Sequence, residues 1–160
     1  MRGSRDLARS LTTLKARYLA INFIGLAMIA SVFVYAGVVE LLKWKWAPFA
    51  GFATLDPHTV ALIKYAFLAL SAAQFGIIKA LQKILPTRSV ENLSMAAVVT
   101  FALCESVAVL GLALFLLSGQ PMDFYIFMVI SLGFFTLFFP KYDEWEQRLR
   151  AGSSPQKTNS

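Results

Sequence analysis

The residue with the clearest chemical potential is a carboxylic acid inside an apolar stretch. Glu105 lies within the run ALCESVAVLGL. It is about 16 Å from the expected start of its helical span at Ser94, at about 1.5 Å per residue, and therefore close to the middle of a bilayer. An ionised acid at that depth costs several kcal/mol, so we expect Glu105 to be protonated at neutral pH or to bind a cation. Such a group suits the exchange of a proton or a sodium ion.

Further polar residues are expected at a similar depth. Gln74 lies about 12 Å from the cytoplasmic end of the preceding span, and Ser106 directly follows the acid. Ser71 lies on the same span as Gln74. Amide, hydroxyl and carboxylate oxygens suit either a cage for a hard monovalent cation or a hydrogen-bond network around a protonated acid. We therefore predict an ion-binding site at Glu105, Gln74 and Ser106. A purely structural use, in which the protonated acid joins two helices, fits equally well.

The other polar residues of the apolar stretches point to no chemistry. Lys64 and Glu40 are expected near the outer ends of their helices, where long side chains can reach the interface, and Asn22 near the cytoplasmic edge. His58 has no second ligand at metal-binding spacing, and the single cysteine, Cys104, is expected to be a buried packing residue. No nucleophile and base pair or phosphate-binding loop is present, so we predict no enzyme, cofactor or metal site.

The composition requires lipid around most of the chain. Of its 160 residues, 58% are hydrophobic and only 15% are charged, too few to cover a soluble domain of this size. We predict a single-domain, all-α integral membrane protein. The net charge of +6 comes from basic residues that flank the apolar spans, which favours anionic lipid headgroups as partners and argues against nucleic acid.

Four apolar segments are long enough to cross a bilayer as helices, separated by turns that contain Pro and Gly. Together they make a membrane domain of two hairpins over residues 18–140. A basic cytoplasmic segment, 1–17, precedes it, and a cytoplasmic amphipathic helix with a disordered tail, 141–160, follows it. The expected spans are about 18–42, 59–81, 93–117 and 124–139.

The distribution of lysine and arginine predicts the orientation. The amino-terminal segment, the turn from Lys79 to Arg88 and the carboxyl-terminal segment hold all of the 15 basic residues except Lys43, Lys45 and Lys64. Short, positively charged loops tend to stay in the cytoplasm, so both termini are expected there. We predict a multi-pass protein of the bacterial inner (cytoplasmic) membrane.

Two helices carry stripes of small residues that would allow close approach of another helix. They suit packing inside one chain or packing between identical chains in a ring. The stripe on the second span consists of Ala66, Ala69, Ala73, Gly76 and Ala80. The stripe on the third span includes Ser94, Ala97, Cys104, Ala108 and Gly111.

A weak internal repeat relates the first and third spans. The run AMIASV at 27–32 can be laid on ALCESV at 102–107, with Ala30 in the place of Glu105. If this repeat is real, the chain carries one intramembrane acid.

The stretch from about 66 to 119 resembles the proteolipid c subunit of F-type and V-type rotary ATP synthases. The resemblance lies in a small-residue helix, a short basic turn with proline, and a second helix that carries a central acid within ALCESVAVLGL. It implies that Glu105 binds the transported ion. In sodium-binding members a glutamine and a serine assist, and Gln74 and Ser106 would fill these roles.

From the residues and the resemblance together we predict a proteolipid-like protein that binds H⁺, or Na⁺, at Glu105 and takes part in proton transport across the membrane, either as a homo-oligomer or in a larger complex. The alternative is a subunit that transports nothing and serves the assembly of a larger membrane complex. In that case Glu105 and Gln74 would act as hydrogen-bonding links between helices.

Overall fold

The computed structural model describes residues 2–53, 55–84 and 90–139, and this part of the chain is helical apart from its connections. The helices are α1 (Arg2–Lys45), α2 (Pro57–Ile84), α3 (Val90–Ser118) and α4 (Pro121–Phe138). All four are long and apolar enough to cross a membrane. The prediction of an all-α chain with four such helices is confirmed.

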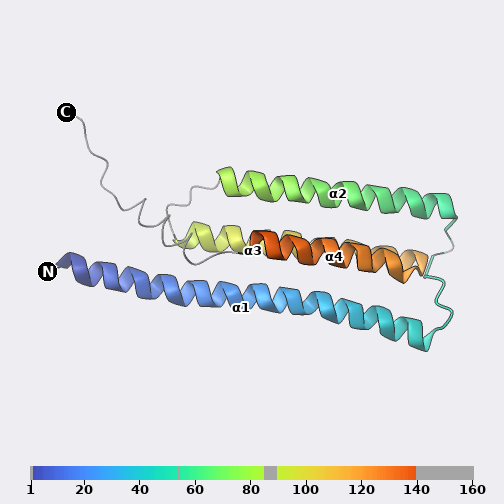
Figure 1. Cartoon of the computed structure of the whole chain (residues 1–160), viewed down its shortest axis with the longest axis horizontal. Coiled ribbons are helices and arrows are strands. Elements are labelled where there is room, and N and C mark those ends of the chain that lie inside the picture. Colours follow the sequence, from blue (N-terminus) through green and yellow to red (C-terminus); the bar gives the residue numbers. More distant parts are fainter. Residues whose placement is uncertain (1, 54, 85–89, 140–160) are drawn as a thin grey trace.

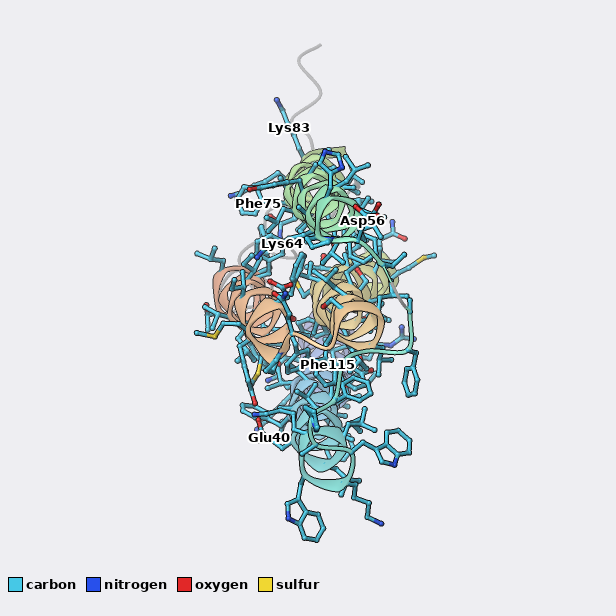
Figure 2. All side chains as sticks on the ribbon, turned by 90° about the vertical axis from the view of Figure 1, so that its right-hand side faces the viewer. Glu40, Asp56, Lys64, Phe75, Lys83 and Phe115 are labelled. Carbon is cyan, nitrogen blue, oxygen red and sulfur yellow. The ribbon has the colours of Figure 1, made fainter. Side chains whose placement is uncertain are left out.

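The four helices lie roughly side by side along one direction (Figure 1). Successive helices run in opposite directions, so α1 and α3 are parallel to each other. The end-on view in Figure 2 shows α3 and α4 next to each other in the middle, with α1 on one side of this pair and α2 on the other. Side chains at the contacts with α3 therefore come from all three other helices.

The helix boundaries differ from the predicted spans at several ends. The basic segment 1–17 is helical from Arg2 and continues without interruption into the first span. The fourth helix begins at Pro121, three residues before the predicted start of that span at Phe124. The predicted amphipathic helix at 141–150 and the tail after it lie outside the described residues, as do residues 85–89 of the basic turn.

Aromatic side chains from α3 and α4 fill the centre of the molecule. Phe101, Phe127 and Phe135 are almost completely buried. Two glycines make room for them: Phe101 packs against Gly25 of α1, and Phe127 packs against Gly111 of α3. A Cβ atom on Gly25 would lie only 2.7 Å from the Phe101 ring, so a larger residue at position 25 would collide with this ring.

The loop after α1 is fastened to the turn between α3 and α4. The backbone amide of Phe52 donates to the Leu116 carbonyl oxygen at 2.7 Å. Gly119 has a φ of +71°, and a Cβ atom there would lie 2.5 Å from the Gly51 nitrogen. Only glycine combines this left-handed backbone with so close an approach. The carboxyl ends of α1 and α3 and the amino end of α4 are thereby held at one level.

Helix α2 starts at a capped amino terminus. Asp56 precedes Pro57, and its carboxylate accepts hydrogen bonds from the Thr59 backbone amide at 3.0 Å and the Thr59 hydroxyl at 2.6 Å. These bonds, the one from the hydroxyl first, hold the pKa of Asp56 below its usual value. Asp followed by Pro at the first helical position is a typical helix start.

Candidate functional site

The Glu105 side chain lies about midway along α3, on the face of that helix that meets α1. The Tyr35 hydroxyl of α1 donates to the Glu105 Oε1 atom at 2.7 Å. The Ser31 hydroxyl, one helical turn earlier on α1, bonds the same oxygen. The acid therefore links the two parallel helices through two hydroxyl groups of its own chain.

The hydroxyl protons of this cluster can be counted. The Ser31 hydroxyl lies 2.6 Å from the Met28 carbonyl oxygen as well as next to Glu105, yet it has one proton to donate. With Glu105 ionised, that proton points to the carboxylate. With Glu105 protonated, the acid donates to the Ser31 oxygen, Ser31 donates to Met28, and Tyr35 still donates to the acid. Both protonation states are thus satisfied, and when Glu105 gains or loses a proton the Ser31 hydroxyl has only to rotate.

Apolar groups lie directly next to the acid on α3. Phe101, one turn before Glu105, and Ala108, one turn after it, are fully buried, and so is the adjacent Cys104. The Cys104 carbonyl oxygen accepts a hydrogen bond from the Ser131 hydroxyl of α4 at 2.7 Å. Glu105 itself is partly buried. Among the described residues, the hydroxyls of Ser31 and Tyr35 are the groups that form hydrogen bonds with the Glu105 side chain.

The structure divides the predicted ion-binding residues between two interfaces. The Gln74 amide nitrogen donates to the Ser106 hydroxyl at 2.9 Å, which joins α2 to α3. Glu105, in contrast, bonds to α1. Consecutive helical residues point about 100° apart, so Glu105 and Ser106 face different neighbours. Gln74 and Ser106 come together as predicted, while the observed hydrogen bonds of the acid come from Ser31 and Tyr35, which the sequence analysis missed.

The second interface leaves one polar atom without a partner. The Gln74 Oε1 atom is buried and accepts no hydrogen bond, and the whole side chain is only 8% exposed. The Ser106 hydroxyl donates to the Leu103 carbonyl oxygen at 2.8 Å, so its single proton is already used. Ser71 behaves in the same way and donates to the Phe67 carbonyl oxygen at 2.9 Å.

The two stripes of small residues have different surroundings. Ala108 and Gly111 of α3 are buried, and Gly111 adjoins Phe127 of α4. All five members of the α2 stripe are exposed, and nothing lies within 4 Å of a Cβ atom built at Gly76. The α2 stripe therefore does not pack against another helix of the described chain, contrary to the first of the two uses expected for it. Packing between chains stays a prediction. The α2 stripe comprises Ala66, Ala69, Ala73, Gly76 and Ala80.

Two further polar links among the described residues lie nearer the carboxyl end of α1 and the amino ends of α2 and α4. Lys64 of α2, which points toward the central helices in Figure 2, forms an ion pair with Asp123 of α4 at 2.6 Å. Glu40 of α1 accepts from the Tyr125 hydroxyl of α4 and pairs with Lys43 at 2.9 Å. The expectation that Lys64 and Glu40 merely reach toward the interface is thus incomplete, because each of them also connects its helix to α4.

The described residues contain no group of three or more His, Cys, Asp or Glu side chains that could hold a metal ion. His58 is exposed at the start of α2. Protein families, curated proteins and solved structures were all compared with this chain, and none of them matches it. Function must therefore be argued from the chain itself.

Proposed function

We propose that this chain is a multi-pass protein of a bacterial cytoplasmic membrane, with both termini in the cytoplasm, and that it binds a proton at Glu105. Four helices that are long and apolar enough to cross a membrane support the first part. The concentration of basic residues on one set of connections supports the orientation.

The observation that carries the proton-binding proposal is the pair of hydroxyls on one carboxylate oxygen. Tyr35 and Ser31 donate to the ionised acid, and Ser31 can accept from the protonated acid while it donates to Met28. Neither state leaves a buried donor or acceptor unpaired, which would cost about 1–3 kcal/mol. A site that satisfies both states can take up and release a proton without a helix having to move.

The geometry favours a proton over a sodium ion. A hard cation is usually held by several oxygens that converge on one point. Here the amide of Gln74 is engaged with Ser106 at the α2 interface, and the acid has two hydroxyls on the α1 side. The resemblance of residues 66–119 to proteolipid c subunits extends the proposal from proton binding to proton transport.

A second candidate function rests on the same hydrogen bonds. Both partners of Glu105 belong to its own chain, so the acid could serve only to fasten α1 to α3. The exposed small-residue stripe of α2 would then suit a helix of a larger membrane complex. In this alternative the chain is an accessory or assembly subunit, and the acid never changes its protonation state.

Reaction with a lipid-soluble carbodiimide tests the proposal, because this reagent modifies protonated carboxylic acids in apolar surroundings. The purified chain in lipid bilayers is treated across a range of pH, and the modified residue is identified by mass spectrometry. We expect modification at Glu105 that declines as the pH rises and that is lost in Glu105→Gln. Glu40→Gln, which removes an exposed acid, should leave the reaction unchanged.

The alternative predicts a different pattern. If Glu105 only fastens two helices, its modification should not change with pH at any value at which the protein stays folded. Such a result, or a Glu105 that does not react while Glu40 does, would contradict proton exchange.

A further inference from the structure

A groove of about 500 Å³ lies between α1 and α3 in their amino-terminal halves. This volume is in the range of small-molecule sites. Arg17, Ala20 and Ile24 line it from α1, and Ser94, Met95 and Val98 line it from α3. The groove lies on the same helix–helix contact as Glu105, but about two to three helical turns closer to the amino end of α3.

The groove has a charged end and apolar walls. Among the described residues that line it, Arg17 is the one with a charge. The walls include exposed hydrophobic side chains: Met95 is 68% and Ile24 38% exposed. Such walls offer water few hydrogen bonds, whereas a hydrocarbon chain could pack against them.

The groove does not include the acid. Neither Glu105 nor Phe101, which packs against Gly25, is among the residues that line it. A charged end and apolar walls together favour a ligand with one charged end and one apolar end.

The position along α1 matches the depth of a lipid headgroup. From Arg17 to Lys43 the helix rises about 39 Å, at about 1.5 Å per residue, which is close to the full thickness of a bilayer with its headgroup regions, about 40–45 Å. With the orientation proposed above, Arg17 lies at the level of the cytoplasmic phosphates. Ala20 and Ile24 then lie at the level of the first part of the acyl chains.

We propose that this groove binds an anionic phospholipid of the cytoplasmic leaflet, with the phosphate at Arg17 and one acyl chain along the apolar walls between α1 and α3. The match between a basic end and an anionic headgroup distinguishes this lipid from zwitterionic neighbours. The inference rests on the proposed membrane arrangement, but not on proton binding at Glu105.

Native mass spectrometry of the chain released from bilayers tests this inference. The bilayers contain equal amounts of phosphatidylglycerol and phosphatidylcholine with identical acyl chains, and the lipids retained by the protein are counted. We expect phosphatidylglycerol to be retained about fivefold more often, as one basic contact would provide. Arg17→Gln should remove this preference, and Ala20→Phe, which fills the groove, should lower the retention of both lipids.

Matched controls lie on the same side of the molecule but on α2. Lys83→Gln removes an exposed positive charge, and Ala80→Phe enlarges an exposed small residue; neither lines the groove. Both variants should bind phosphatidylglycerol as the unchanged chain does. Equal retention of the two lipids, or an equal loss in Lys83→Gln and Arg17→Gln, would overturn the inference. A chain that does not insert into the bilayers would instead contradict the proposed membrane arrangement.

Discussion

At the scale of single residues, the Glu105 carboxylate has partners that serve both of its protonation states. Tyr35 donates in either state, while Ser31 can turn between the carboxylate and the Met28 carbonyl oxygen. The ionised and protonated states of Glu105 thus differ in the orientation of one hydroxyl group and in the charge of the acid. Small changes in the surroundings of Glu105 would then shift the balance between the two states.

The bond between Tyr35 and Glu105 should be measurable as a coupling energy. In a double-mutant cycle of Tyr35→Phe and Glu105→Leu, followed by unfolding in detergent, we expect a coupling of about 0.5–1.5 kcal/mol. The matched control replaces Tyr35→Phe by Tyr65→Phe, an exposed tyrosine on α2. That cycle should give no coupling, and equal values in the two cycles would show that Tyr35 does not act on Glu105 directly.

Gln74 should contribute little to stability despite its buried position. Its amide oxygen is unpartnered, and Ser106 keeps its bond to the Leu103 carbonyl oxygen when Gln74 is replaced. Gln74→Met retains the length of the side chain and removes the unpaired acceptor, so we expect a change in unfolding free energy below about 1 kcal/mol. The same variant should leave carbodiimide modification of Glu105 unchanged. If the reaction were lost in this variant, Gln74 would have to be part of the site at Glu105, contrary to this prediction.

The sequence revealed the depth of the polar residues better than their direction. Gln74 and Ser106, which were expected near the level of Glu105, do lie at one level and bond to each other. Direction around the helix axis decides which of them meet, and it changes by about 100° with each residue. It depends on how the helices are arranged around α3, which one sequence does not reveal.

At the scale of elements, two polar links among the described residues join α2 to the other helices. One is the bond from Gln74 to Ser106, and the other is the ion pair between Lys64 and Asp123. In that pair the Asp123 side chain is only 4% exposed, whereas the Lys64 side chain is 31% exposed. Removal of Lys64 alone would leave a buried carboxylate without this partner, which is costly.

Lys64→Met should therefore destabilise the protein by about 2–3 kcal/mol at neutral pH, a value reduced by the partial exposure of Lys64. The double variant Lys64→Met with Asp123→Leu should recover most of this loss, because no charge remains buried. Lys43→Met breaks the exposed pair with Glu40 and should destabilise the protein much less. Unfolding in detergent measures all three, and equal losses for Lys64→Met and Lys43→Met would contradict the assignment.

The helices themselves were largely predictable from hydrophobic runs and breakers, but their ends were not. The backbone N–H at the first position of a helix has no partner within the helix, so proline, which lacks this group, fits there. Helix α4 can therefore start at Pro121, where a turn was expected from the sequence. Charged residues did not stop α1 either: its helix extends back to Arg2 through the basic segment. Hydropathy indicates which part of a helix avoids water, but it does not indicate the residue at which helical hydrogen bonding ends.

At the scale of the whole molecule, one helix contact carries the features of interest in order. Along the contact of α1 with α3 lie the groove at Arg17, the packing of Phe101 against Gly25, and then Glu105. Helix α2 lies on the opposite side of the central pair from α1 (Figure 2), and its stripe of small residues is exposed. A partner helix on that face would leave both the groove and the acid undisturbed.

The proposed orientation predicts opposite labelling of two introduced cysteines. Cys104 is buried, so Cys104→Ala provides a background without an accessible thiol. In this background, Lys83→Cys should react with a membrane-impermeant maleimide only from the cytoplasmic side. Lys45→Cys should react only from the outside. Labelling of both positions from the same side would contradict a membrane crossing by α2.

The most direct test of the central claim is an infrared pH titration of the purified chain in bilayers, with the glutamate carboxyl groups labelled with ¹³C. We predict a carbonyl stretching band of a protonated glutamic acid that is lost when the proton is released. The band should be absent from Glu105→Gln and unchanged in Glu40→Gln. A band that persists in Glu105→Gln, or no protonated glutamic acid at any pH at which the protein is folded, would contradict proton binding at Glu105.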